Sequence, residues 1–294
     1  MLSLLIPTVA QGLLWALMAL GVYVTFRVLD IADLTVEGSF PLGAATAASM
    51  MVAGFGPLTA LLAAFVAGML AGVVTGLLHT KMKIPALLAG ILTMIALYSV
   101  NLRIMGKANL SLLGVDTTFK IAKSALDLSM AQTTLVVGLA VTLIVGFFMY
   151  WFFGTQIGAA IRATGFNQQM IRAQGVDTDI TIILGLLLSN GLVAVSGALV
   201  AQSNGFSDVG MGTGTIVIGL ASVIIGEVLF GTRSFKNCLI SVVLGSIVYR
   251  IVIAAVLAIG MPPNDLKLFT SVLVALALSM PLIKAKMGGR KAVR

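Results

Sequence analysis

The chain has 294 residues, of which 59% are apolar and only 10% are charged, and its mean hydropathy is +1.12. Soluble domains carry about 25% charged residues, so this composition excludes an ordinary soluble protein and indicates an integral membrane protein. The net charge of +8 does not indicate nucleic-acid binding, because most basic residues fall in short loops and in the tail. The lone Cys238 excludes an internal disulfide and a cysteine-based metal cage.

Nine runs of apolar residues are candidate membrane spans, since crossing about 30 Å of hydrocarbon takes about 20 helical residues. The first run has no positively charged segment before it and continues to Val24, so we expect a retained span rather than a cleaved signal peptide. We predict an all-α polytopic membrane protein of about nine spans, roughly eight to ten. The expected spans are residues 6–24, 38–54, 58–78, 85–101, 131–153, 181–203, 213–231, 238–258 and 267–283.

The basic residues of the connecting segments predict the orientation. If the N-terminus is outside, twelve Lys and Arg residues fall on the inner side and five on the outer side. Cytoplasmic loops carry an excess of Lys and Arg, so we expect the N-terminus outside and the C-terminus in the cytoplasm. The inner residues are Arg27, Lys81, Lys83, Arg162, Arg172, Arg233, Lys236, Lys284, Lys286, Arg290, Lys291 and Arg294, and the outer ones are Arg103, Lys107, Lys120, Lys123 and Lys267.

Three carboxylates, those of Asp30, Asp33 and Glu37, lie beside the start of the second span. Acids at such a place are unfavourable unless they face water, a partner or a helix N-terminus. One interpretation is capping, because Asp33 and Thr35 suit an N-cap and Glu37 suits a first helical turn. The other is a polar hinge, including Ser39, that lines a translocation path.

Residues 102–129 form the only long segment expected on the outer side. Apolar positions alternate in it with residues of mixed charge. It is either a docking site for an extracytoplasmic binding protein or a plain surface loop.

Residues 154–179 are the longest polar, basic interruption between apolar runs. No proline occurs from Ala159 to Gln174 and helix formers are frequent, so we predict one helix there. Gly175 would end this helix as a left-handed cap, before a polar restart at residues 177–179. The segment is typical of a short helix lying across the cytoplasmic face, and a solvated loop is the alternative. The polar side of the helix would hold Arg162, Asn167, Gln168 and Arg172.

A glycine-rich segment, Gly205–Thr215, separates the sixth and seventh spans. It lacks the Gly-Lys-Ser/Thr ending of a phosphate-binding Walker A loop, which occurs nowhere in the chain. We therefore expect an irregular break that lines a cavity or is covered by protein. Its free N–H groups suit an anionic part of a substrate. The polar candidates for a translocation path here are Asp208, Thr213 and Thr215.

The sequence contains a weak internal repeat. Asp33–Ala45 aligns with Asp208–Ala221 if one residue is inserted, and five expected spans separate the copies. An odd number of spans would turn the second copy upside down, as in transporters built from inverted repeats with broken helices. Chance similarity between two glycine-rich helix starts is the alternative. We predict a single membrane domain, 1–294, with a first repeat (1–125), a linking span and cytoplasmic helix (126–180), and a second, inverted repeat (181–294).

Two charges, those of Glu227 and Arg250, fall within expected spans and are therefore functional candidates. Either they pair with each other, or Arg250 extends to the interface. His79 is the only histidine, and no Ser-His-Asp or His-Glu-x-x-His arrangement occurs. We expect no catalytic residue and no metal site.

Three stretches, Asp30–Ala45, Arg162–Asp179 and Asp208–Glu227, resemble permease subunits of ABC importers of the branched-chain amino acid type. The resemblance covers nearly the whole chain. It implies that the Ala159–Gln174 helix is a coupling helix that docks on an ATP-hydrolysing subunit, although Phe166 stands where relatives often have an acid. The implied coupling residues are Arg162, Asn167, Arg172, Gly175 and Asp177. The implied pathway residues are Asp33, Thr35, Glu37, Ser39, Asp208, Thr213, Thr215 and Glu227.

The resemblance also implies that solute transport and ATP hydrolysis are carried out by different subunits. ATP and magnesium would bind a partner ATPase, so this chain would carry no cofactor and would not itself be an enzyme. The other expected partners are a solute-binding protein outside, a second permease copy forming a homodimer, and the bilayer of the bacterial inner membrane. The solute would be small and polar, such as an amino acid or a related compound. Two alternatives remain: a secondary carrier or channel with an inverted repeat, and an intramembrane scaffold.

Overall fold

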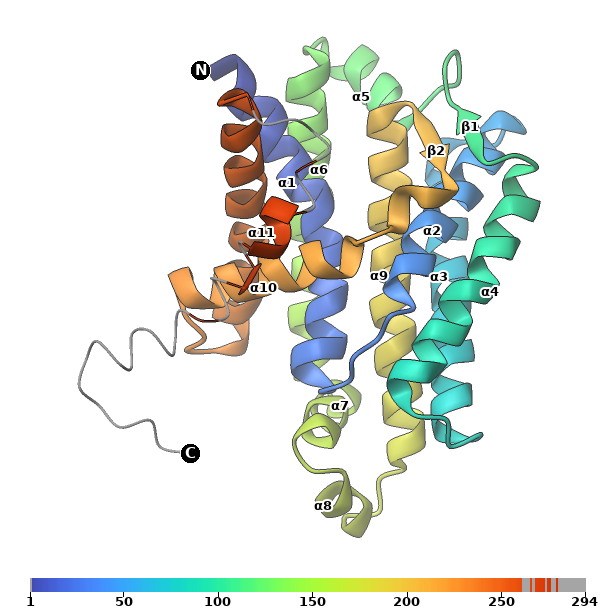
Figure 1. Ribbon diagram of the computed structural model, residues 1–294, viewed down its shortest axis with the longest axis vertical. Coiled ribbons are helices and arrows are strands. Elements are labelled where there is room, and N and C mark those ends of the chain that lie inside the picture. The colour runs from blue at the N-terminus through green and yellow to red at the C-terminus, as the bar shows by residue number, and fades with distance from the viewer. Residues whose placement is uncertain (1, 261–264, 266–267, 273, 276–278, 280–294) are drawn as a thin grey trace.

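The computed structural model describes residues 2–260, 265, 268–272, 274–275 and 279 (Figure 1). Almost all of this part is helical. The α-helices are α1 (Leu2–Tyr23), α2 (Val36–Val52), α3 (Pro57–Thr80), α4 (Ala86–Met105), α5 (Thr118–Leu126), α6 (Met130–Gly154), α7 (Gln156–Phe166), α8 (Gln168–Ala173), α9 (Thr178–Asn204), α10 (Thr215–Phe230) and α11 (Phe235–Ala258). The remaining elements are the π-helical turn η1 (Val24–Val28), the 3₁₀ turn η2 (Val209–Gly212), and the strands β1 (Asn109–Ser111) and β2 (Phe206–Asp208).

Seven helical stretches of the described part are long and apolar enough to cross a membrane. They are α1 with η1, α3, α4, α6, α9, η2 with α10, and α11, and these seven candidate spans coincide with seven of the nine predicted ones. The predicted span 38–54 is helix α2, which has 17 residues and is largely buried. The predicted span 267–283 lies mostly outside the described residues.

Helix α9 lies at the centre of the bundle, packed against α1, α2 and α3 (Figure 1). Small residues make this close packing possible, as is common between membrane helices. A Cβ atom added to Gly43 of α2 would lie 1.9 Å from the Ala194 carbonyl oxygen, and one added to Gly197 of α9 would lie 1.9 Å from the Phe40 carbonyl oxygen. The backbones of α2 and α9 therefore touch directly at two places.

Serine side chains connect α1 to its neighbours across the bundle. Ser189 and Ser196 of α9 donate hydrogen bonds to the carbonyl oxygens of Gly21 and Leu14, each at 2.7 Å. Ser246 of α11 donates to the Gly12 carbonyl oxygen at 2.9 Å. Such bonds satisfy hydroxyls that have no water to bind inside a membrane bundle.

The two ends of the bundle carry different short elements (Figure 1). At one end lie α5 and the antiparallel pair β1–β2, in which Leu110 is opposite Ser207. The expected loop 102–129 therefore contains the end of α4, a strand and a helix, and it buries Leu112 and Phe119 almost completely. At the other end, α7 and α8 extend beyond the long helices.

The prediction of one continuous helix over Ala159–Gln174 is wrong. Residues 156–173 form two helices, α7 and α8, separated at Asn167. Asn167 has extended backbone angles (φ −159°, ψ 96°), and its side-chain oxygen accepts a hydrogen bond from the Met170 N–H at 3.0 Å. Asparagine is a strong N-cap residue, so this side chain begins a new helix rather than continuing the old one. The expected left-handed end at Gly175 is confirmed by its φ of +84°.

Candidate functional site

The segment between η1 and α2 carries a buried polar network. The Asp33 carboxylate accepts hydrogen bonds from the Thr35 N–H at 2.9 Å and from the Asn190 side-chain amide of α9 at 2.8 Å. Asn190 in turn accepts a bond from the Ser39 hydroxyl at 2.6 Å, and the Thr35 hydroxyl bonds that of Thr75 at 2.7 Å. All five side chains are at most 2% exposed.

Three predicted pathway residues belong to this one network: Asp33, Thr35 and Ser39. They join the start of α2 to α9 and α3, and none of them lines the neighbouring pocket described below. The sequence interpretation missed Asn190 and Thr75 as their partners. A polar Asn190 near the middle of an apolar run was the available signal, because a buried amide needs hydrogen-bond partners.

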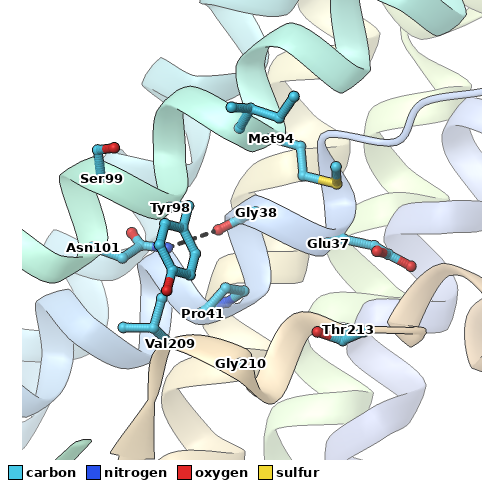
Figure 2. Close-up of a pocket in the computed structure, with 11 residues that line it drawn as sticks. Glu37, Gly38, Pro41, Met94, Tyr98, Ser99, Asn101, Val209, Gly210 and Thr213 are labelled. Carbon is cyan, nitrogen blue, oxygen red and sulfur yellow. Dashed lines mark hydrogen bonds between the residues drawn. The ribbon is translucent and has the colours of Figure 1, made fainter. Parts of the chain in front are cut away.

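A pocket of about 430 Å³ lies between α2, α4 and η2 (Figure 2). Glu37 of α2 and Thr213 of the η2–α10 loop line one side, and Tyr98 and Asn101 of α4 line the other. One Glu37 carboxylate oxygen accepts a hydrogen bond from the Gly214 N–H at 3.0 Å. The first-turn position predicted for Glu37 is confirmed, and its carboxylate additionally connects α2 to the start of α10.

Helix α4 supplies pocket residues that the sequence interpretation missed. The Asn101 amide donates a hydrogen bond to the Gly38 carbonyl oxygen at 3.3 Å, which Figure 2 shows as a dashed line. Its side-chain oxygen is buried and has no hydrogen-bond partner among the described residues. Met94 and Tyr98 add apolar and aromatic surface. The pocket therefore combines a carboxylate with an apolar and aromatic wall.

The remaining residues of the glycine-rich segment shape its backbone. The Asp208 carboxylate accepts from the Gly210 N–H at 2.7 Å and from the Asn109 side chain of β1 at 3.2 Å. The Thr215 hydroxyl is buried and donates to the Gly212 carbonyl oxygen at 2.8 Å. Thus only Thr213 of the three candidates here reaches the pocket.

Glu227 lies away from this pocket, at the end of α10. Arg27 of η1 donates from its Nε to the Glu227 carboxylate at 2.9 Å and also pairs with it through a terminal guanidinium nitrogen. The pairing of Glu227 with Arg250 is therefore wrong. The Arg250 guanidinium instead lies over the Trp15 ring, 4.1 Å from its centroid.

The predicted coupling residues occupy different positions around α7 and α8. Asn167 and Asp177 are N-caps, the latter accepting from the Asp179 N–H at 2.8 Å. Arg172 is exposed and lies 3.6 Å from the Asp179 carboxylate. The Arg162 guanidinium faces the bundle, 5.2 Å from the centre of the Phe235 ring of α11.

The corner between α7 and α8 exposes apolar side chains. Phe166 is 91% exposed, and the Met170 side chain beside it on α8 is also exposed. Helix α7 is at the same time held tightly to the bundle: a Cβ on Gly165 would lie 1.9 Å from the Val28 carbonyl oxygen of η1. The Thr164 hydroxyl also bonds that of Thr181 in α9 at 2.8 Å.

Residues 4–279 match the family described as "Branched-chain amino acid transport system / permease component". The chain belongs to this permease family. The permease is 41% identical over 273 residues to a tyrosine transport system permease protein of Clostridioides difficile (strain R20291), covering 93% of this chain and 90% of that one.

More distant relatives cover most of the permease as well. It is 31% identical over 271 residues to a galactofuranose transporter permease protein of Escherichia coli (strain K12), covering 90% and 75% of the two chains. A solved structure described as an inward-facing conformation of a metal-chelate-type ABC transporter covers 96% of this chain and 85% of that chain. It has a TM-score of 0.53 at 15% sequence identity, so this likeness concerns the fold. The chain is an ABC transporter permease that crosses the membrane several times.

Among the residues that the structure describes, no group of three or more His, Cys, Asp or Glu side chains could hold a metal ion.

Proposed function

We propose that this permease is the membrane subunit of an ATP-driven importer that carries an amino acid or a related small polar solute inward. The main observation is the α7–α8 corner, which exposes Phe166 at the end of α7 while Gly158, Ile161 and Thr164 of the same helix are buried in the bundle. An exposed aromatic side chain on a rigid support is typical of a protein interface. The occupant of this corner would be the ATPase subunit, because the chain has no Walker A motif of its own.

In this proposal the N-terminus is outside and the C-terminus inside, in the bacterial inner membrane. Lys81 supports this orientation, because it lies on the α7–α8 side and pairs with Asp179 at 3.1 Å. The ATPase, with its ATP and magnesium, would bind on that side. A solute-binding protein would bind at the α5, β1 and β2 end, and a second copy of the permease would complete a homodimer.

The proposed inverted repeat, residues 1–125 and 181–294, is supported by helix packing. If α1 corresponds to α9, and α3 to α11, then the α3–α9 contact should have a counterpart between α1 and α11. Both pairs are in contact, and both use glycine: Gly72 lies against Leu186, and Gly12 lies against Ile247. Residues 126–180 would then link the two repeats.

Movement of the ATPase would reach the pathway through α7. The hydrogen bond between Thr164 and Thr181 connects α7 to α9, and the close contact of Gly165 with Val28 connects it to η1. Arg172 and Phe166 would contact the ATPase directly. Asn167, Gly175 and Asp177 would fix the directions of α8 and α9, and Arg162 would hold α7 against α11.

The pocket supports an amino acid as the solute. The Glu37 carboxylate can accept hydrogen bonds from an ammonium group. Tyr98 and Met94 offer a surface for an apolar or aromatic side chain. A relative named as a tyrosine transport permease agrees with this chemistry. In this proposal Asp33, Thr35, Ser39, Asp208 and Thr215 position the pathway, Thr213 joins Glu37 in lining it, and Glu227 stabilises its inner end.

Reconstitution tests the proposed function. In proteoliposomes that contain the permease with its ATPase, and with the solute-binding protein on the opposite side of the membrane, we expect amino-acid uptake only when ATP and magnesium are on the ATPase side. Radiolabelled uptake measures this, with the ATPase omitted as the control. Uptake by the permease alone, driven by a proton or sodium gradient, would instead support a secondary carrier.

Changing Glu37→Gln tests the pocket. We expect loss of the charge to raise the half-saturating concentration of the amino acid by roughly 10- to 100-fold, since a hydrogen bond to a charged group contributes about 1.5–3 kcal/mol. Transport of an analogue that lacks the ammonium group should change little. The matched control is Asp30→Asn, which removes an exposed acid outside the pocket. Equal effects of the two changes would exclude Glu37 as the ammonium partner.

A further inference from the structure

Two adjacent cavities lie where α6, α7 and α11 meet. The first, the basic pocket, has a volume of about 650 Å³ and lies between the end of α6, α7 and the start of α11. The second, the apolar groove, has about 360 Å³ and lies between α1, α6 and α11. Tyr150 and Lys236 line both, so the two cavities adjoin at these side chains.

The basic pocket has the chemistry of an anion site. Arg162 and Lys236 supply its positive charges. The Arg162 Nε is buried and has no hydrogen-bond partner among the described residues. Thr155 and Ser234, the N-caps of α7 and α11, also line the pocket, so two helix N-termini are directed toward it. Helix N-termini and unpaired guanidinium N–H groups both favour a phosphate or another anion.

The apolar groove has the chemistry of an acyl-chain site. Leucine, valine, isoleucine and phenylalanine side chains form most of its wall, including the exposed Leu143 and Phe147 of α6. At Gly146, which also lines the groove, an added Cβ would meet no atom within 4 Å. The groove is therefore open at this position and faces the hydrocarbon side of the bundle.

We propose that the two cavities together bind one anionic phospholipid from the leaflet on the α7–α8 side. Its phosphate would lie in the basic pocket, between Arg162 and Lys236, and an acyl chain would follow the groove past Gly146. Tyr150 and Trp151 mark the headgroup level, where aromatic residues concentrate in membrane proteins. A soluble phosphate would occupy the basic pocket alone, whereas a phospholipid would occupy both the basic pocket and the apolar groove. This site is separate from the transport pocket.

The first experiment removes the two positive charges of the basic pocket with the double variant Arg162→Gln and Lys236→Gln. The full-length protein is purified in detergent and titrated with dioleoylphosphatidylglycerol or dioleoylphosphatidylcholine, and bound lipid is counted by native mass spectrometry. We expect the wild type to prefer the anionic lipid and the double variant to bind it about tenfold or more weakly. The matched control, Arg103→Gln with Lys123→Gln, removes two exposed charges on α4 and α5 and should leave binding unchanged.

The second experiment fills the apolar groove with Gly146→Leu, whose side chain would enter it without a clash at the Cβ position. We expect it to weaken phosphatidylglycerol binding while the thermal midpoint stays at or above that of the wild type, because leucine favours a helix more than glycine does. A large excess of glycerol 3-phosphate should not displace the lipid. Unchanged lipid binding in both variants, or full displacement by glycerol 3-phosphate, would overturn the proposal. Failure of the double variant to fold would leave Gly146→Leu as the deciding measurement.

Discussion

Changing Gly43→Leu is expected to prevent stable folding of the permease. Even a Cβ atom at this position would lie 1.9 Å from the Ala194 carbonyl oxygen, and the nearest atoms belong to the α9 backbone. A backbone cannot rotate away as a side chain can, so α2 and α9 would have to separate. Such overpacking commonly costs about 1–3 kcal/mol and more where nothing can move aside, so we expect a loss of about 3 kcal/mol or more.

The loss is measured as the thermal midpoint and the monodisperse yield of purified protein. Gly146→Leu is the matched control, because it places the same side chain on a helical glycine where a Cβ meets no atom within 4 Å. We expect the control to be neutral or slightly stabilising. Similar midpoints for the two variants would mean that α2 and α9 are less closely packed than described.

Changing Phe166→Ala is expected to remove most of the affinity for the ATPase subunit without unfolding the permease. The side chain is 91% exposed, so its removal leaves no cavity in the permease. Aromatic residues at the centre of an interface contribute about 2 kcal/mol or more, which corresponds to roughly 30-fold in affinity. The dissociation constant for the ATPase, measured by surface plasmon resonance in detergent, checks this.

Phe55→Ala provides the control for that experiment. Phe55 is 58% exposed and precedes α3, whose opposite end is the one near α8, so it lies at the far end of the bundle from Phe166. Its removal should leave ATPase affinity and ATP-dependent uptake unchanged. A wild-type affinity in Phe166→Ala would place the ATPase contact elsewhere on the permease.

The sequence predicted features that depend on neighbouring residues and missed those that depend on distant ones. Apolar run lengths located seven spans, and Gly175 ended a helix as expected. The break at Asn167 was missed because asparagine is allowed within a helix, and only its backbone conformation makes it a cap. The partner of Glu227 was missed because Arg27 lies 200 positions away in the chain.

The same distinction applies to the candidate site. The acids near Thr35 were recognised as unusual for a membrane segment, yet the sequence did not separate the buried Asp33 from Glu37 in the pocket wall. That difference depends on Asn190, which supplies a hydrogen bond to Asp33 from another helix. No local pattern connects Tyr98 and Asn101 of α4 to the pocket, because only the packing of α4 beside α2 places them there.

The direct backbone contact between α2 and α9 limits how the pocket can open. Two carbonyl–glycine contacts and the buried bonds around Asn190 oppose sliding between these helices, and the Thr164–Thr181 bond joins α7 to α9. Helix α4 meets α2 at Gly38 less closely: a Cβ added there would lie 2.9 Å from the Leu97 side chain and 3.1 Å from the Met94 Cα, and the Asn101 amide bonds the Gly38 carbonyl oxygen. In the proposed transport cycle the Glu37 side of the pocket would therefore move with α9, and access for the solute would depend on how far that side separates from the Tyr98 side on α4.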